Sequence, residues 1–347
     1  MTEAPSVKEL FAKAMTLFES GQYAEAIKGY EEIIKINPNL AEAWTNKGSA
    51  YAALGQYIEA INDYNRAITI NPRLLEPRLN EGVIYNNLDR LKEAVEVFDD
   101  AIKINPDDEA IWYNRGIALQ KAGKLPEAIV SYDEAIRINP ENAMVWNNKG
   151  VALYEQSHHE LALKSFEQAI HLRPNYAKAW NNKGNTLADS GKNELAIQAY
   201  DEALRLDPKF NEALVSKANA LINLARYDDA ISVYDELIEL NPKDAIPWHG
   251  KGVALLRATK RREALSAFIK ATEIDPDFDE AWFEKGALYA RSGKHEEAVA
   301  AFERAVKIDP NFARAWHFLS VSFDKLGRHS DATKAHAKAC ELDPSYQ

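Results

Sequence analysis

The chain has 347 residues and a formal net charge of −11, with 42 lysines and arginines against 53 acidic residues. This balance argues against a nucleic-acid phosphate binder, which needs a basic face, and it disfavours acidic membrane surfaces. The single cysteine, Cys340, excludes a disulfide framework, and no stretch approaches the roughly 18 consecutive apolar residues of a membrane span. We therefore expect a cytoplasmic protein with neither membrane nor nucleic-acid partners.

The sequence repeats with a period of 34 residues from Val7 onwards, and the register never slips. Counting positions from the first residue of each repeat, position 32 is always proline and position 20 is always alanine. All seven tryptophans lie at position 4, and seven of the ten repeats have glycine at position 8. The ten repeats begin at Val7, Ala41, Leu75, Glu109, Ala143, Ala177, Asn211, Ala245, Asp279 and Ala313.

Each repeat is predicted to be a helix, a tight turn and an antiparallel helix. Residues 1–6 form an N-terminal cap segment, in which Ser6 and Glu9 make a capping-box pattern for the first helix. Apolar residues at positions 4, 8 and 11 give one helical stripe, and those at positions 20, 24 and 27 give a second. Glycine at position 15, present in six repeats, ends the first helix, and the proline at position 32 ends the second. Residues 345–347 remain as a C-terminal tail.

Three repeats depart from the pattern and are expected to pack less well. The third has Arg78 at position 4, beside Pro77, where most repeats have tryptophan. The seventh has Leu214 at that position, and the tenth has His336 at position 24 instead of tyrosine or phenylalanine. The last helix, rich in alanine and lysine, is predicted to serve as a polar end cap.

These residues, at these spacings, resemble the tetratricopeptide repeat, whose period is 34 residues. The resemblance covers Val7 to Pro344. It implies an all-α, right-handed solenoid superhelix in which ten tandem repeats over residues 7–344 form one stacked rod. In this family the first helices of the repeats line a concave groove where partners bind.

Positions 2, 6, 9 and 13 of the first helix lie opposite its buried stripe and are the candidate partner-binding surface. Position 6 is asparagine in five successive repeats, and its amide offers both donors and an acceptor that can hold an extended peptide by its backbone. The series resembles the asparagine ladder in the repeat arm of the O-linked N-acetylglucosamine transferases. The alternative is that duplication copied these side chains and that they only face water. The candidate amides are Asn46, Asn80, Asn114, Asn148 and Asn182, joined by Asn87, Asn185 and Asn219.

Cations occupy position 13 in the last three repeats, at Arg257, Arg291 and Lys325, with Arg314 at position 2. They could receive an acidic stretch or a carboxylate of a partner. Glu280 and Glu284 are close to them in the sequence, so a solvated face of mixed charge is the competing interpretation. A further row of bases at position 7 flanks the buried stripe, where aspartates at position 25 such as Asp99 are plausible structural partners.

No catalytic, cofactor or metal constellation is found, and the protein is predicted not to be an enzyme. His158, His159 and Glu160 lack the spacing of metal ligands. Cys340 has His336 four residues before it, and we interpret Cys340 as a half-buried structural thiol. The favoured function is a protein–protein interaction scaffold that holds an extended or helical partner segment in its groove. The alternatives are a substrate-recognition arm for a glycosyltransferase or other enzyme whose catalytic part is on another chain, and a self-assembling scaffold.

Overall fold

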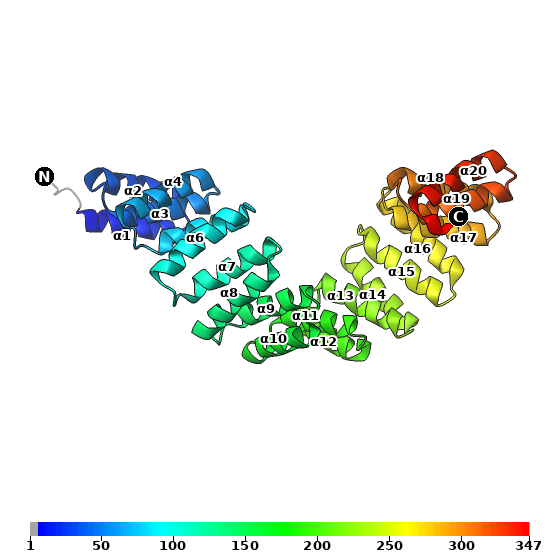
Figure 1. Ribbon diagram of the computed structural model, residues 1–347, viewed down its shortest axis with the longest axis horizontal. Helices are drawn as coiled ribbons and strands as arrows, with labels where there is room; N and C mark the ends of the chain where they lie inside the picture. The colour runs from blue at the N-terminus through cyan, green and yellow to red at the C-terminus, as the bar shows by residue number, and fades with distance from the viewer. Residues whose placement is uncertain (1–5, 347) are drawn as a thin grey trace. The chain divides into compact units, whose positions relative to one another are not determined.

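The computed structural model describes residues 6–346, so the predicted cap segment, apart from Ser6, and the final Gln347 lie outside it. Within that range the chain forms twenty α-helices and one short 3-10 helix, and no β-strand. The helices group into two compact units, Met1–Pro174 and Asn175–Gln347 (Figure 1). Each unit contains five helical hairpins in sequence order, which confirms the predicted all-α solenoid of ten repeats. None of the helices in residues 6–346 is both long and apolar enough to cross a bilayer.

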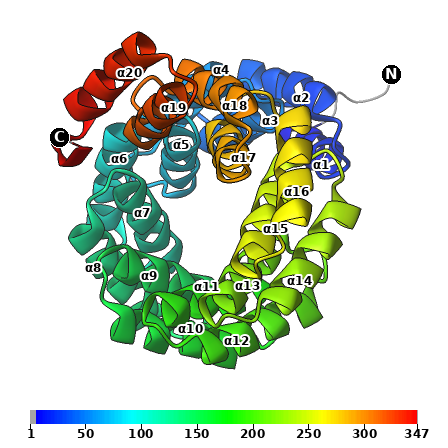
Figure 2. The ribbon, with the colours of Figure 1, turned by 90° about the vertical axis from the view of Figure 1, so that its right-hand side faces the viewer.

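Odd-numbered helices are the first helices of the repeats, here called A helices, and even-numbered ones are B helices. Figure 2 shows the A helices α5, α7 and α9 on one side of unit 1 and the B helices α6, α8 and α10 on the other. The bounds in unit 1 are α1 Val7–Glu19, α2 Tyr23–Ile36, α3 Ala41–Ala53, α4 Tyr57–Ile70, α5 Glu76–Asn87, α6 Leu91–Ile104, α7 Glu109–Lys121, α8 Leu125–Ile138, α9 Ala143–Glu155 and α10 His159–Leu172.

Unit 2 repeats the same lengths, with A helices at positions 1–13 and B helices at positions 17–30 of each repeat. The bounds are α11 Ala177–Asp189, α12 Asn193–Leu206, α13 Asn211–Asn223, α14 Tyr227–Leu240, α15 Ala245–Arg257, α16 Arg261–Ile274, α17 Asp279–Arg291, α18 His295–Ile308, α19 Ala313–Lys325 and α20 His329–Leu342, followed by the 3-10 helix η1 Pro344–Tyr346.

The helices begin and end at the local signals that the sequence predicts. Ser6 is the N-cap of α1: its Oγ accepts from the Glu9 N–H at 3.3 Å, and its own N–H donates to Glu9 Oε2 at 2.7 Å, which completes the capping box. Helix α2 ends at Ile36, two residues before the position-32 proline Pro38, because the residue before a proline avoids the helical region.

The turn between the paired helices places position 15 in the left-handed region in every repeat. The six glycines there have φ between 72° and 77°, as at Gly191. The other four repeats keep the same turn without glycine, at Asp89, Ser157, Ala225 and Thr259, with φ between 54° and 63°. A side chain with a Cβ is strained in this region, so these four turns cost stability that the glycine turns do not.

Replacing Ala225 by glycine is therefore expected to stabilise unit 2 by about 0.5–1 kcal/mol, the left-handed penalty less the entropy that glycine adds to the unfolded chain. The check is the protection of α13 and α14 amides against hydrogen exchange, which should rise. Gly191→Ala, the reverse change at the same position, should lower protection in α11 and α12. An unchanged or lower protection in Ala225→Gly would contradict the strain argument.

In the first nine hairpins the core is the ring at position 24, which lies over the small residue at position 8. Phe98, Tyr132 and Phe268 are at most 1% exposed. A Cβ added to Gly116 would meet the Tyr132 ring at 2.5 Å, so the glycine is needed for this close approach. The tryptophans at position 4 are half-buried. Several of them join successive repeats: the Trp112 indole N–H donates to the Pro106 carbonyl at 2.8 Å.

Charged side chains reinforce the same joints between repeats. The position-7 base Arg115 donates from Nε to Asp99, at position 25 of the preceding repeat, at 2.7 Å. Its guanidinium also lies over the Trp112 ring, 5.8 Å from the ring centroid. The predicted structural role of position 7 is thus confirmed, and the pairing recurs within the units as Lys149–Asp133, Lys217–Asp201 and Lys251–Asp235.

Two of the three predicted weak repeats are indeed less closely packed. Hairpins α5–α6 and α13–α14, which contain Arg78 and Leu214, pack less extensively than the other hairpins of their units. The tenth hairpin does not, because His336 is left exposed while the small Ala332, Ala335 and Ala339 bring α20 close to α19. The end of the chain packs back onto α19, where the Tyr346 ring stacks on His317 with centroids 4.6 Å apart.

Candidate functional site

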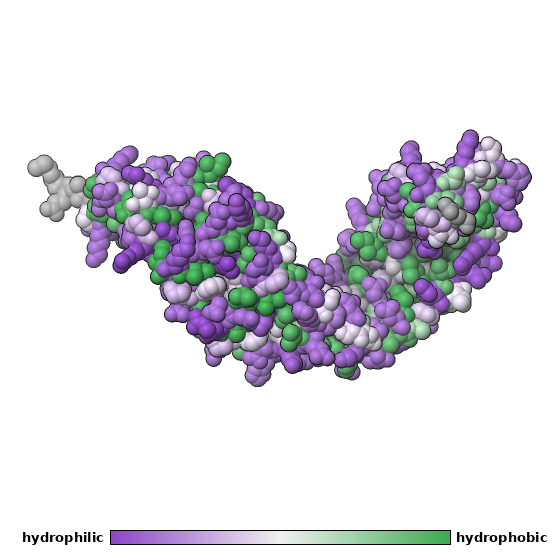
Figure 3. All heavy atoms as spheres, viewed as in Figure 1, coloured by the Kyte–Doolittle hydropathy of each residue, from purple (hydrophilic) through white to green (hydrophobic). Residues whose placement is uncertain are grey.

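Within each unit most neighbouring A helices contact one another, and the surface that the A helices present is here called the A face. In unit 1, α3 contacts α5, α5 contacts α7 and α7 contacts α9, and in unit 2 α11 contacts α13, α13 contacts α15 and α17 contacts α19. The side of the molecule seen in Figure 3 is mostly hydrophilic, with apolar residues scattered over both units. A candidate site therefore has to be argued from particular side chains, and most polar candidates lie on the A faces.

The position-6 asparagines of unit 1 lie half-buried on successive A helices, and two of them bond to the neighbouring repeat. Asn80 donates from Nδ2 to Ser49 Oγ at 3.4 Å, and Asn148 donates from Nδ2 to the Tyr113 hydroxyl at 3.2 Å. Asn114 instead donates to the Ala110 carbonyl of its own helix at 2.8 Å. The Asn148 Oδ1 also accepts from Asn147 Nδ2 at 3.2 Å. Each amide has two donor hydrogens and an oxygen with two lone pairs, so these bonds use only part of its capacity.

The tyrosine hydroxyls at position 24 explain why the amides lie where they do. Burial raises the pKa of Tyr64, and hydrogen bonds from Ser49 and Asn80 act in the opposite direction. Burial likewise raises the pKa of Tyr30 and of Tyr132. A hydrogen bond from the asparagine of the following repeat, Asn46 or Asn148, acts in the opposite direction. The repeat before Asn114 has Phe98 at this position and offers no hydroxyl, which accounts for the different bond of Asn114.

The candidate amides of unit 2 lie on α11 and α13. Asn182 and Asn185 lie half-buried on α11, and Asn219 lies exposed on α13. As Tyr64 does with Ser49 in unit 1, the position-24 hydroxyls bond to position 9 of their own repeat: Tyr200 donates to Asn185 Oδ1 at 2.8 Å and Tyr234 donates to Asn219 Oδ1 at 3.0 Å. The amide surface is therefore richest on α3 to α9 of unit 1, where Asn87 adds an exposed amide on α5.

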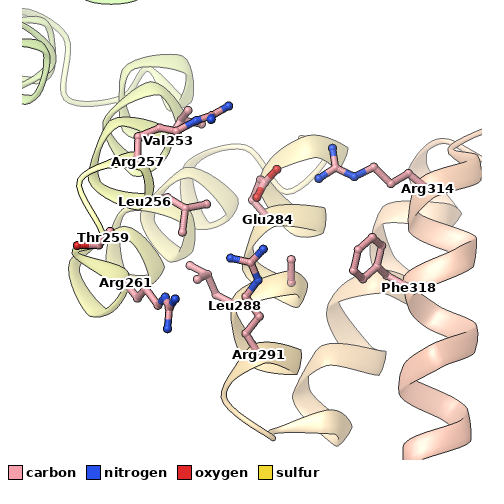
Figure 4. Close-up of a pocket in the computed structure, with 11 residues that line it drawn as sticks. Val253, Leu256, Arg257, Thr259, Arg261, Glu284, Leu288, Arg291, Arg314 and Phe318 are labelled. Carbon is pink, nitrogen blue, oxygen red and sulfur yellow. The ribbon is translucent and has the colours of Figure 1, made fainter. Parts of the chain in front are cut away.

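The arginines predicted near the C-terminus converge on one cavity of about 480 Å³ formed by α15, α17 and α19 (Figure 4). Arg257, Arg291 and Arg314 line it together with Glu284. Lys325, predicted as the third member of the position-13 row, is exposed and does not line the cavity. The helical pattern missed Arg261, which also lines it, because this residue begins the B helix α16 and its place depends on the turn at Thr259.

A second cavity, of about 310 Å³, lies at α1 and α3 in unit 1 and was not predicted. Met15, Phe18 and the edge of Tyr30 give it apolar walls, and Asn46 and Ser49 give it polar groups. Glu19 and Glu76 add two carboxylates. The sequence signal was weak because these residues come from six different positions of three repeats.

Within residues 6–346 there is no cluster of histidine, cysteine and acidic side chains that could hold a metal ion. Cys340 is half-buried, and its Sγ lies 3.6 Å from His336 Nε2 on the same helix. His336 is exposed on α20, and Cys340 lies one helical turn after it, in keeping with the interpretation of a structural thiol.

The chain matches family models for one kind of repeat along most of its length. A model described as tetratricopeptide repeat matches residues 147–209, 181–245, 215–259, 249–311 and 292–346, which together cover 147–346 without a gap. A second model with this description matches residues 41–74 and 110–142, and a model described as TPR repeat matches 16–55 and 82–123. No curated protein matches the chain.

Solved structures similar to the chain share its fold. A repeat protein from Cytophaga hutchinsonii is 17% identical with a TM-score of 0.59, over 70% of this chain and 99% of its own. One from Parabacteroides merdae is 21% identical with a TM-score of 0.56, over 72% and 98%. Yeast Tom70 is 14% identical with a TM-score of 0.53, over 97% and 92%. With family models matching well over half of its residues, the chain belongs to the tetratricopeptide-repeat family.

Proposed function

We propose that the protein is a non-enzymatic scaffold that binds an extended or helical segment of a partner protein along its A faces. The tetratricopeptide repeat is in general a non-catalytic, protein-interaction fold. The observation that carries the proposal is the row of half-buried amides on α3, α5, α7 and α9, which keep donors and acceptors beyond their bonds to neighbouring repeats. An extended backbone presents one donor and one acceptor per residue, which matches such a row without demanding a sequence.

The test uses a fluorescein-labelled library of short uncharged peptides, with binding to the full chain followed by fluorescence anisotropy. The variant Asn80→Ala/Asn114→Ala/Asn148→Ala should bind about tenfold more weakly or worse, because it loses several peptide hydrogen bonds of about 0.5–1.5 kcal/mol each. The matched control is Asn62→Ala/Gln168→Ala, which removes amides from the B helices α4 and α10.

Circular dichroism should show that both variants keep their helical content at the assay temperature. Equal affinity in the A-face variant and the wild type would remove the amides from the binding surface. A matching loss in the B-helix control would show that the effect is not specific to the A face.

The same amide row also suits a substrate-recognition arm whose catalytic part is on another chain, the role suggested by its resemblance to the arm of the O-linked N-acetylglucosamine transferases. The two proposals share the surface and differ in what the partner does next. Co-purification of a glycosyltransferase activity with the full chain, lost in the A-face variant, would favour the arm over a free-standing scaffold. Self-assembly predicts instead a rise in light scattering with the protein's own concentration.

A further inference from the structure

Four guanidinium groups converge on the cavity formed by α15, α17 and α19, here called the arginine pocket. Figure 4 shows Arg257 and Arg314 approaching the space around Glu284 from opposite helices, with Arg291 beside it and Arg261 at the near end of α16. Arg314 is held in place by the buried Phe283 ring, whose centroid lies 4.5 Å from its guanidinium carbon. All four arginines are exposed, and the helices that carry them fix where their side chains begin.

The charges of the pocket are not balanced by the protein. Within residues 175–346 none of the four arginines forms an ion pair, although Arg205, Arg226 and Arg304 of the same unit each pair with an aspartate or glutamate. Glu284 is the one carboxylate that lines the pocket. Its burial raises its pKa, while Arg314, Arg291 and Arg257 act to lower it, so the three cations interact with that carboxylate at a distance. Four cations and one anion leave an excess of positive charge in a chain whose net charge is −11.

The remaining wall of the pocket is mostly apolar. Leu256, Leu288 and Phe318 line it, together with Val253, Ala287 and the polar Thr259. Leu288 is buried, and Phe318 is half-buried at position 6, where repeats two to six have asparagine. This half of the A face in unit 2 thus offers an apolar contact beside the guanidinium groups instead of further amides. A ligand that uses both has to place an apolar group next to an anion.

We propose that the arginine pocket binds an aspartate or glutamate side chain of the partner segment, next to a leucine-sized or aromatic side chain that packs on Leu256, Leu288 and Phe318. The inference rests on the proposed function, since it gives the bound segment an acidic-apolar anchor in unit 2. Guanidinium forks match a carboxylate in geometry and pair with it through charge-assisted hydrogen bonds. Arginine also pairs with phosphate, so the test below includes a phosphorylated library that distinguishes the two anions.

The test compares three fluorescein-labelled peptide libraries with randomised flanks and a fixed centre of Leu-Glu-Leu, Leu-Gln-Leu or Leu-phosphothreonine-Leu. Binding to the full chain is followed by fluorescence anisotropy at low and physiological salt. The glutamate library should bind about tenfold more tightly than the glutamine library, with an advantage that shrinks as salt rises. Arg257→Ala/Arg291→Ala should abolish that advantage.

Two further variants separate the pocket from general charge effects. Arg205→Ala/Arg262→Ala removes the same charge from the exposed B-helix surface of α12 and α16, and should leave the preference for glutamate unchanged. Glu284→Gln removes the only carboxylate of the pocket and should tighten binding of the glutamate library several-fold, a gain that damage to the fold would not produce.

Three results would overturn the inference, and one of them would also contradict the proposed function. Equal binding of the glutamate and glutamine libraries, unaffected by Arg257→Ala/Arg291→Ala, removes the arginine pocket and leaves the scaffold proposal standing. Tighter binding of the phosphothreonine library assigns the pocket to phosphate instead of carboxylate. Absence of binding by all three libraries contradicts the pocket and the proposed function together.

Discussion

Replacing Phe268 by alanine is expected to destabilise the eighth hairpin, α15–α16, by about 3–5 kcal/mol, the range for truncating a fully buried aromatic side chain. Phe268 is 0% exposed and packs with Leu255, Ala264 and Leu288 in a cluster that reaches the next repeat. A helix of 14 residues is marginal alone in water, so the hairpin has little other support. The loss should therefore extend into α17, which packs on this cluster through Leu288.

The glycine opposite the ring gives a second, coupled expectation. A Cβ at Gly252 would lie 2.6 Å from the Phe268 ring, so Gly252→Ala alone should cost about 1–3 kcal/mol through overpacking. In Gly252→Ala/Phe268→Ala the clash disappears and the new methyl fills part of the cavity. The double variant should consequently be more stable than the sum of the single losses predicts.

Hydrogen exchange of individual helices is the suitable measurement, because long repeat arrays need not unfold in one step. Protection of α15, α16 and α17 should fall in each single variant, while Ser266→Ala, an exposed change on α16, should leave it intact. Additive losses in the double variant would mean that the glycine and the ring are not coupled by close packing.

Replacing Trp112 by alanine should weaken the joint between the third and fourth repeats by about 3 kcal/mol, at the lower end of the range for tryptophan because the ring is half-buried. The indole N–H bond to the Pro106 carbonyl and the contact with Arg115 are both lost. Because Arg115 also bonds to Asp99 of the preceding repeat, the loss should appear as reduced protection of both α6 and α7.

Trp112→Phe is the matched variant for the tryptophan, since it keeps an aromatic ring and removes the N–H donor. It should cost about 1 kcal/mol, the net value of one hydrogen bond. The third repeat shows what the joint is like without tryptophan: Arg78 occupies the position, and α4 and α5 pack less extensively than the other consecutive helices of unit 1. Equal losses in Trp112→Phe and Trp112→Ala would mean that the hydrogen bond, and not the packing of the ring, stabilises the contact between the two repeats.

The helix bounds could be read from the sequence because each boundary has a local chemical cause. The Ser6–Glu9 capping box, the glycine turn and the proline that stops the B helix all act within a few residues. Even the third repeat follows this logic: α5 begins one residue late, at Glu76, with Pro77 in its first turn. The turn at Ala225 is less obvious, since only the repeated register indicates a left-handed residue there.

The candidate site could be predicted only in outline, because side-chain partners across repeats are not encoded in a single repeat. Helical spacing placed Asn80 and Asn114 on one surface but could not show that one bonds to Ser49 and the other to its own helix. That difference depends on whether the preceding ring is tyrosine or phenylalanine. Likewise Arg261 joins the arginine pocket through the turn that precedes α16, whereas Lys325 shares the predicted position yet lies apart from the pocket.

The central claim is that partners lie on the A faces, and site-specific photo-crosslinking tests it most directly. p-Benzoylphenylalanine is placed either at Asn87, exposed on the A helix α5, or at Glu96, exposed on the B helix α6 of the same hairpin. After illumination with the uncharged fluorescein-labelled peptide library, the account predicts label on the Asn87 variant and little on the Glu96 variant. Equal labelling at the two positions, or stronger labelling at Glu96, would contradict it.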